Sequence, residues 1–439
     1  MYLYIDPGTG SMLFSIIIGV FGVVVFLART LIIKLKFIAS GGKKSAETDK
    51  NTLPIVIFSD HKRYWNVFKP VCDEMEKRKK TIYYWTASPD DPALDEKYEF
   101  VKTEFIGEGN KAISRMNMLR ATMVFSTTPS LDVFQWKRSK FVKYYVHIVH
   151  MATDLSIYKM FGLDFYDAVI TGGEYQMKQV RDIEAVRGIP QKEVLPLGIP
   201  YMDTMLQRFK DSSDSPKNDK PVVLLAPTWG GSSLLNRFGS EFIDRLIDTG
   251  YEIVIRPHPQ SFTADKALMD SLQEKYKDGE KVSWNRDTDN FDILKKADIL
   301  ISDFSGVVFD FSLIYDKPVI YVDTEFNPDQ YDCSWLDETP WVFRTLPSIG
   351  RELKAENASQ IKAVIDECLS GGDSEALAKG RDKARAEAWA NIGKSAPLIA
   401  DYLCNKYDEL LKQAKKEASE GAKKSTRSFK PAIKASAAK

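Results

Sequence analysis

Short apolar runs alternate with helical segments along most of the chain, and this alternation restricts the fold more than any other feature of the sequence. Runs such as Leu53–Ser59 (LPIVIFS) and Pro221–Ala226 (PVVLLA) have the length and composition of strands that are buried on both faces. Strands that alternate with helices form parallel sheets, and ligands bind in the loops at their carboxyl ends. The sequence therefore predicts an α/β fold with doubly wound sheets.

The alternation occurs twice, and the polar residues 210–220 (KDSSDSPKNDK) between the two halves have the composition of a linker. A chain of 439 residues is also longer than one hydrophobic core usually serves. We therefore predict two Rossmann-like domains facing each other across a cleft, at residues 53–209 and 221–415. The second ends in a long helical segment, Ser374–Lys415, whose outer part can cross back onto the first domain. Residues 416–439 are basic and nearly free of large apolar groups, which predicts a disordered tail.

An apolar stretch near the N-terminus predicts one membrane-spanning helix. Residues 12–33 are 22 residues long and carry Arg29 as their only charge. This length is enough to cross a hydrocarbon layer of ~30 Å at ~1.5 Å per residue. The residues before the span include Asp6 but no Lys or Arg, so they do not fit a cleaved signal peptide.

The positive charges lie at the far end of this span and beyond it, at Arg29, Lys34 and Lys36. By the positive-inside rule, the chain that follows the span lies in the cytoplasm. We therefore expect residues 1–38 to form an anchor and residues 39–52 to form a tether. The protein is predicted to be a single-pass protein of the cell membrane with its catalytic part in the cytoplasm.

Overall composition excludes several classes of protein. The chain has 61 basic and 61 acidic residues, so its net charge gives no general attraction for nucleic acid. Its four cysteines are scattered, with no CxxC spacing that would suggest a metal site or a disulfide framework. No carboxylate pair of the DxD type follows a strand, and Asp287-Thr288-Asp289 comes closest. We therefore expect no metal site and no required cofactor.

The stretch Ile301–Phe311 (ISDFSGVVFDF) predicts a strand that turns into a helix. Ser302, Asp303 and Ser305 lie at the junction, where the first N–H groups of the helix have no partner within the helix. Such an end attracts anions, because the free N–H groups and the helix dipole point the same way. Ordinary helix capping is the alternative, since Ser and Asp are favoured at this position for that reason alone.

Two histidines follow predicted strands from different halves of the chain. His150 ends the strand Lys143–His150, and the two-residue period of a strand places His147 on the opposite face. His258 stands between two prolines that fix the backbone, two residues after Arg256. A single histidine on a strand is usually a core residue. An arginine and an imidazole beside one strand end, however, form a plausible grip for phosphate.

A third loop of the second half, APTWGGSS, contains hydroxyl groups such as that of Thr228, which can donate to phosphate oxygens. Its two glycines let the backbone approach a ligand closely. Three loops with anion-binding groups thus follow strands of one domain. Their convergence favours a diphosphate site over simple capping.

These motifs together resemble the CDP-glycerol glycerophosphotransferase family. The resemblance rests on APTW, RPHP, ISDFSG with the FDF that follows it, and KPVIYVD, and it is strongest over residues 220–325. The family makes teichoic acids and related wall polymers and has the glycosyltransferase-B architecture of two Rossmann-like domains. The resemblance implies that His150 is the general base for an acceptor hydroxyl and that His258 stabilises the donor diphosphate.

The resemblance also implies a set of donor contacts. Ser302, Asp303 and Ser305 would hold phosphates at the helix N-terminus, and Asp310 would orient the donor. Gly306 stands where family members often have a second Ser, which removes one hydroxyl group. The chain also reads HMATD after the proposed base, where many members have HGTP.

The leading hypothesis is a membrane-tethered enzyme that transfers glycerol phosphate, or another polyol phosphate, from a CDP donor. A lipid-linked or polymeric cell-wall acceptor would receive the group. One alternative keeps the architecture but transfers a sugar from a nucleotide-sugar. A second alternative, from another class, is a non-catalytic sensor of a nucleotide-linked precursor.

Overall fold

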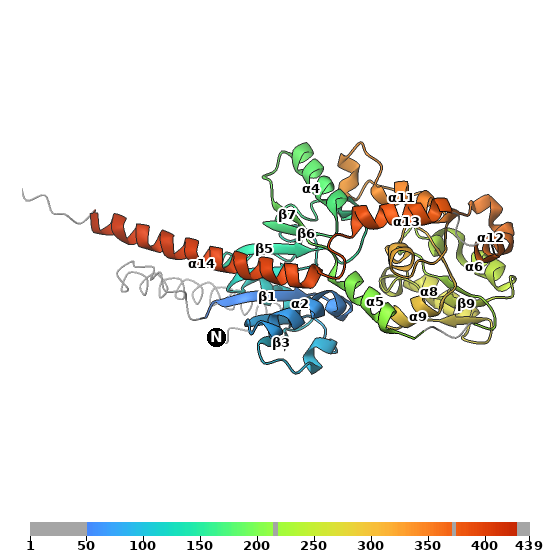
Figure 1. Cartoon of the computed structure of the whole chain (residues 1–439), viewed down its shortest axis with the longest axis horizontal. Helices are drawn as coiled ribbons and strands as arrows, with labels where there is room; N and C mark the ends of the chain where they lie inside the picture. The colour runs from blue at the N-terminus through green and yellow to red at the C-terminus, as the bar shows by residue number, and fades with distance from the viewer. Residues whose placement is uncertain (1–50, 214–217, 371–374, 428–439) are drawn as a thin grey trace, which may run out of the picture. The chain divides into compact units, whose positions relative to one another are not determined.

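The computed structural model describes residues 51–213, 218–370 and 375–427 (Figure 1). The predicted membrane span at residues 12–33 lies outside the described residues. Over the part of the chain that is described, no helix combines the length and hydrophobicity needed to cross a membrane. Residues 51–411 form one compact unit, which contains two separate parallel sheets. This confirms the predicted α/β class and its repetition along the chain.

The first lobe is built on a seven-stranded sheet in the order β3-β2-β1-β4-β5-β6-β7. Every neighbouring pair is parallel, so all carboxyl ends lie at one edge of the sheet. The strand order changes direction between β1 and β4, which is where doubly wound folds bind ligands. The strands are β1 (Leu53–Ser59), β2 (Ile82–Thr86), β3 (Val101–Phe105), β4 (Ala121–Ser126), β5 (Val142–Ile148), β6 (Ala168–Thr171) and β7 (Glu193–Pro196), and the helices are α2 (Trp65–Lys77), α3 (Gly109–Asn117) and α4 (Glu174–Arg187).

The second lobe has a six-stranded parallel sheet in the order β10-β9-β8-β11-β12-β13, with its change of direction between β8 and β11. Its strands are β8 (Val222–Leu225), β9 (Glu252–Ile255), β10 (Val282–Trp284), β11 (Ile299–Ser302), β12 (Val319–Tyr321) and β13 (Arg351–Glu352). Its helices are α6 (Leu234–Ile247), α7 (Ser261–Ala264), α8 (Lys266–Lys275), α9 (Phe291–Lys296), α10 (Val307–Phe309), the π-helical turn η4 (Asp310–Ile314), α11 (Trp341–Ile349), α12 (Ile361–Ser370) and α13 (Glu375–Ala388).

Two predicted boundaries are corrected by the structure. Helix α5 (Pro200–Asp211) extends into the predicted linker at residues 210–220, and Asn218 there donates to the carbonyl of Lys296. Helix α14 (Ser395–Arg427) continues through the first part of the tail predicted to be disordered from residue 416. Ala, Glu and Lys dominate this part, and their high helix propensity outweighs the lack of large apolar groups.

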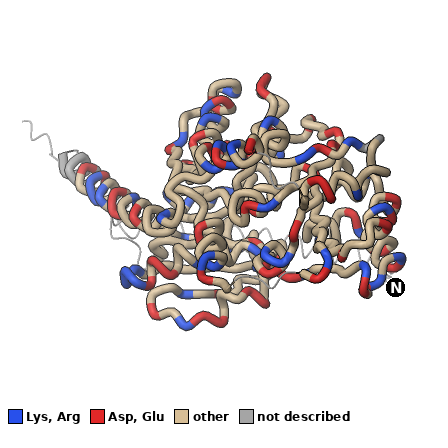
Figure 2. The backbone as a smooth tube through the Cα atoms, turned by 45° about the vertical axis from the view of Figure 1, so that its right-hand side comes forward, with Lys and Arg blue, Asp and Glu red and all other residues tan. Residues whose placement is uncertain are grey.

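Lysines, arginines and acidic residues are interspersed along the described backbone (Figure 2).

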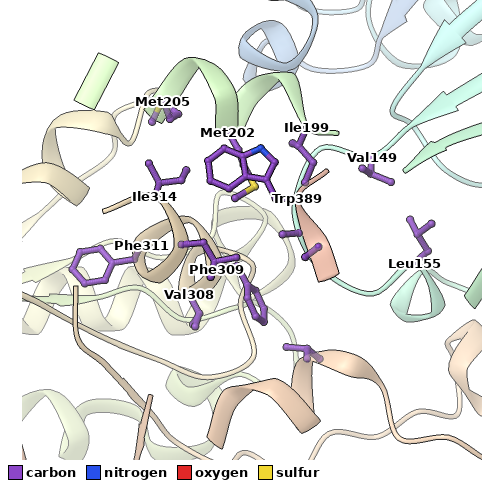
Figure 3. Packing of buried hydrophobic residues seen from close by; sticks show 14 of the residues in the cluster. Val149, Leu155, Ile199, Met202, Met205, Val308, Phe309, Phe311, Ile314 and Trp389 are labelled. Carbon is purple, nitrogen blue, oxygen red and sulfur yellow. The ribbon is translucent and has the colours of Figure 1, made fainter. Parts of the chain in front are cut away.

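A continuous apolar core joins the two lobes. It runs from Val149 and Ile199 in the first lobe, through Met202 on α5, to Phe309 and its neighbours in the second. Figure 3 shows these side chains gathered around Trp389, which lies beside Met202. The indole N–H of Trp389 donates to Asp203 at 2.8 Å. Because buried side chains from both lobes pack into one core, the separation of the lobes can change only through small side-chain movements.

The chain crosses back to the first lobe after α13, where its backbone lies directly against two glycines of that lobe, Gly172 and Gly173. A Cβ atom on Gly172 would lie 2.6 Å from the carbonyl oxygen of Ala388, and one on Gly173 would lie closer still to that of Glu387. The Ala390 N–H donates to the carbonyl of Gly172 at 2.7 Å. Helix α14 then packs Ile399, Ala400 and Leu403 into the core beneath β1 and α2, so the predicted crossing is confirmed.

We predict that Gly173→Ala lowers the free energy of unfolding by about 1–3 kcal/mol, the usual cost of overpacking. The added methyl group would meet backbone atoms of Glu387, which cannot rotate away as a side chain can. Gly279→Ala is the matched control, because the nearest atom to its added Cβ would be 3.9 Å away. Urea unfolding of both variants checks this, and equal midpoints would contradict it.

Candidate active site

A cavity of about 500 Å³ lies between the lobes at the carboxyl ends of both sheets. Its walls come from the loops after β1 and β5 in the first lobe and after β8, β9 and β11 in the second. Of the nine residues singled out from the sequence, seven line this cavity. These are His150, Thr228, Arg256, His258, Ser305, Gly306 and Asp310.

His150 is held in place by two neighbours from its own lobe. The Thr127 hydroxyl lies 3.0 Å from its Nδ1 atom, and the Tyr64 ring meets the imidazole edge-on at 5.1 Å between centroids. With Nδ1 engaged by Thr127, Nε2 is the ring nitrogen left for a ligand. His147 is fully buried, with its Nε2 atom 3.2 Å from the Tyr158 hydroxyl, so it does not share this site.

The electrostatics of the cavity keep His150 uncharged. Burial, the positive charge of Arg63 and the nearby His258 together lower the pKa of His150 to about 3. An imidazole in this state is neutral at physiological pH and can accept a proton. Arg63 also lines the cavity, and its buried Nε atom has no hydrogen-bond partner among the described residues.

His258 faces the same cavity from the second lobe in a defined tautomer. Its Nδ1 atom accepts a hydrogen bond from the Gln260 N–H at 3.1 Å. A neutral imidazole that accepts at Nδ1 carries its proton on Nε2, which makes it a hydrogen-bond donor toward the cavity. Burial and the positive charges of Arg63 and Arg256 together lower the pKa of His258 to about 4.

Arg256 is oriented by the loop that follows β10. Its guanidinium donates to the side chain of Asn285 and, at 2.9 Å, to the carbonyl of Asp287. Two of its nitrogens are thus committed to this loop. The guanidinium nevertheless forms part of the cavity wall, so it brings a fixed positive charge beside His258.

Ser302 and Asp303 do not line the cavity. The structure therefore does not place them for the predicted direct contact with phosphate. The Ser302 hydroxyl donates to the carbonyl of Ala226 at 2.7 Å. The Asp303 carboxylate accepts from the N–H groups of Thr228, Leu234 and Ser305 at 2.9 to 3.1 Å. Both side chains are buried and serve to join the loop after β8 to the loop after β11.

Asp310 lies at the start of the π-helical turn η4, which directly continues α10. A π-helical turn is rare and is frequent at functional sites. One carboxylate oxygen of Asp310 accepts from the Tyr201 hydroxyl at 3.3 Å, and the other has no partner within the described residues. Burial raises the pKa of Asp310 to about 7. The side chain can therefore change charge near neutral pH.

The structure adds residues that sequence reasoning missed, namely Arg63, Tyr64, Thr127 and Tyr201, and it places Met151 of the HMATD stretch in the cavity wall. Arg63 and Tyr64 follow β1, at the switch point of the first sheet, where the topology rule predicts a ligand site. The position of β1 in the sequence was therefore the signal that could have pointed to Arg63 and Tyr64. His61, which also follows β1, lies outside the cavity lining. In the described ranges, no group of three or more His, Cys, Asp or Glu side chains could hold a metal ion.

Two lobes with parallel sheets, and a cavity between them that is lined by His150 and His258, define a two-lobed α/β architecture of the glycosyltransferase-B type. The sequence profile of the CDP-Glycerol:Poly(glycerophosphate) glycerophosphotransferase family matches residues 44–333, more than half of the chain. The chain therefore belongs to this family, as the motifs predicted.

Comparison with known proteins finds similarity to a teichoic acid primase and to a teichoic acid polymerase. The teichoic acid glycerol-phosphate primase of Bacillus subtilis is 27% identical over 164 residues, which cover 36% of this chain and 39% of the primase. The chain thus matches about two fifths of the length of this curated relative. The structure of the wall teichoic acid polymerase TagF aligns with a TM-score of 0.55 at 17% identity, over 88% of this chain and 98% of that one. This likeness supports a shared fold.

We predict that the unfolding free energy of the wild type, relative to Asp310→Asn, falls as pH rises from 4 to 8. A carboxyl group whose pKa is raised by folding stabilises the protein below its unfolded pKa, and this contribution is lost as pH rises through the folded pKa of about 7. The change should exceed about 1 kcal/mol, since one pKa unit corresponds to about 1.4 kcal/mol.

Urea unfolding at pH 4, 6 and 8 measures this difference. Asp292→Asn, on the exposed surface of α9, controls for the loss of one carboxylate. A constant difference between wild type and Asp310→Asn across this range would contradict the prediction.

Proposed function

We propose that the protein transfers glycerol phosphate, or a closely related polyol phosphate, from a CDP donor to a hydroxyl group of a cell-wall polymer or its lipid-linked precursor. One observation carries this proposal: His150 from one lobe and His258, Arg256 and Ser305 from the other line a single cavity. Membership of the glycerophosphotransferase family supports the same reaction.

In the proposed reaction the acceptor hydroxyl attacks the β-phosphorus of the donor. A new P–O bond forms, the bond from the β-phosphorus to the bridging oxygen breaks, and CMP leaves with that oxygen. His150 takes the proton from the attacking hydroxyl on Nε2, the nitrogen that Thr127 leaves free. The product is a phosphodiester.

The second lobe would hold the donor diphosphate. The Nε2–H group of His258 donates a hydrogen bond, and the guanidinium of Arg256 supplies a fixed positive charge. The hydroxyl group of Ser305, which lines the cavity, adds a neutral donor. Such preorganised groups stabilise the charge that grows on the leaving CMP without requiring a metal ion.

Membrane attachment belongs to the same proposal. An apolar span at residues 12–33 would keep the catalytic part at the inner leaflet, where a lipid-linked acceptor is embedded. Tethering raises the effective concentration of enzyme near such an acceptor.

The nucleotide that is released tests the proposal. The full chain is incubated in detergent micelles with CDP-glycerol, CDP-ribitol or UDP-sugars and a glycerol phosphate oligomer as acceptor. CMP release that depends on the acceptor supports the proposal. UDP release without CMP would instead favour a glycosyltransferase, and nucleotide binding without turnover would favour a sensor.

We predict that His150→Ala lowers kcat by at least about a hundredfold, the lower end of the contribution of a general base. Donor affinity should change only a few-fold, because His150 contacts the acceptor side. Thr127→Val keeps the shape of the supporting residue but removes its hydroxyl, and it should lower kcat less. Isothermal titration with the donor separates binding from chemistry, and a large loss of donor affinity in His150→Ala would contradict the assignment.

We also predict that Arg63→Gln moves the acid limb of the kcat/KM profile to higher pH. The positive charge of Arg63 lowers the pKa of His150, so its removal makes protonation easier. Catalysis needs neutral His150, hence activity is lost at a higher pH in the variant. Profiles that extend down to about pH 3 measure the shift, since the pKa of His150 in the free protein is about 3. Lys62→Gln, which lies outside the cavity lining, is the control. An acid limb that stays in place would contradict the prediction.

A further inference from the structure

Gly306 and Met151 meet across the cavity, one from each lobe. A Cβ atom placed on Gly306 would lie 2.6 Å from the sulfur of Met151 and 3.4 Å from the γ-methyl of Thr153. The first of these distances is too short for a real contact. The Met151 side chain therefore occupies the space that any side chain at position 306 would need.

The backbone does not require glycine at this position. Gly306 has φ −56° and ψ −26°, which is ordinary right-handed helical geometry. It is also the N-cap of α10, where serine is favoured over glycine. Neither conformation nor capping accounts for the glycine, so packing against Met151 is the physical reason that the structure offers.

The segment that carries Met151 is held firmly. The buried amide of Gln176 donates to the carbonyls of Met151 and Thr153 at 3.3 and 2.6 Å. Asp154, at the end of the segment, accepts from the N–H groups of Trp341 and Val342 in the second lobe, both at 2.7 Å. The backbone cannot retreat, so only the side chain of Met151 can move, and the cavity is the open space beside it.

We propose that Met151 and Gly306 form a matched contact between the lobes that limits the room for the transferred group and so selects a three-carbon over a five-carbon polyol phosphate. This inference rests on the proposed function. Met151 directly follows the proposed base and Gly306 directly follows Ser305, so the contact lies between the acceptor hydroxyl and the donor phosphates. The polyol attached to the β-phosphate must occupy that part of the cavity.

Steady-state kinetics with CDP-glycerol and CDP-ribitol test the selection. The wild type should prefer CDP-glycerol, and Met151→Ala should reduce the ratio of the two kcat/KM values by about tenfold or more, the usual effect of a few methylene groups in a pocket. Met151→Leu keeps the volume of the side chain and should keep the ratio. An unchanged ratio in Met151→Ala would overturn the inference.

The contact itself is tested by a double-mutant cycle. Gly306→Ala should raise the KM for CDP-glycerol by about tenfold, because the methyl group pushes the Met151 side chain into the cavity. Adding Met151→Ala to this variant should restore most of the affinity, as expected for two residues in direct contact. Effects that simply add in the double variant would overturn the contact.

These experiments distinguish a failure of the proposed function from a failure of the inference about Met151 and Gly306. If the wild type releases CMP from neither donor, the proposed function and the inference both fail. If it releases CMP but Met151→Ala leaves the ratio unchanged or the cycle is additive, only the inference fails. Urea unfolding of the same four proteins gives a second readout of the contact that does not depend on activity, and additive changes there also count against it.

Discussion

The buried carboxylate of Asp303 holds the second-lobe side of the site together. It accepts hydrogen bonds from three backbone N–H groups, one in the loop after β8, one at the start of α6 and one in the turn before α10. Burial alone would make a carboxylate costly, and these three donors supply the compensation that a buried ionised group needs. Because one side chain holds both loops, residues from each of them, such as Thr228 and Ser305, line the same cavity.

The lobes must also keep a fixed separation, since a proton acceptor on one serves a phosphate held by the other. Three kinds of contact provide this. The apolar core around Trp389 joins the lobes, and Asp154 caps α11 across their boundary. The buried ion pair of Arg187 with Asp332 joins the end of α4 to the segment that follows β12. In addition, Gly172 and Gly173 lie against the backbone of Glu387 and Ala388, where there is no room for a side chain. A cavity with these supports changes size mainly through the side chains that line it.

Much of the fold could be predicted from the sequence because parallel strands buried on both faces give continuous apolar runs. The strand Leu53–Ser59 was predicted to the residue. Strand β3 (VKTEF) was missed because it lies at the edge of the sheet and its residues are mostly exposed or half-buried. The continuation of α14 was missed because its helicity comes from local propensity, which a search for apolar patterns does not detect.

The site was predictable where a motif follows a strand, as at His150 and His258, because topology alone brings such loops to one edge. It was not predictable where the direction of a side chain decides its role. Ser302 and Ser305 lie three residues apart, yet one hydroxyl bonds to the neighbouring strand while the other residue lines the cavity. Sequence spacing cannot distinguish them, because the turn between strand and helix has no fixed period.

The charges in the cavity suggest how donor binding and catalysis are coupled. In the free protein, Arg63 and burial lower the pKa of both imidazoles, so each is neutral and His150 is only a weak base. A bound diphosphate would bring negative charge beside Arg63 and Arg256 and offset their effect. The part of the pKa lowering of His150 that comes from Arg63 would then be offset, which makes His150 a stronger base once the donor is in place. Such coupling limits proton abstraction to the complex in which a phosphorus atom is ready for attack.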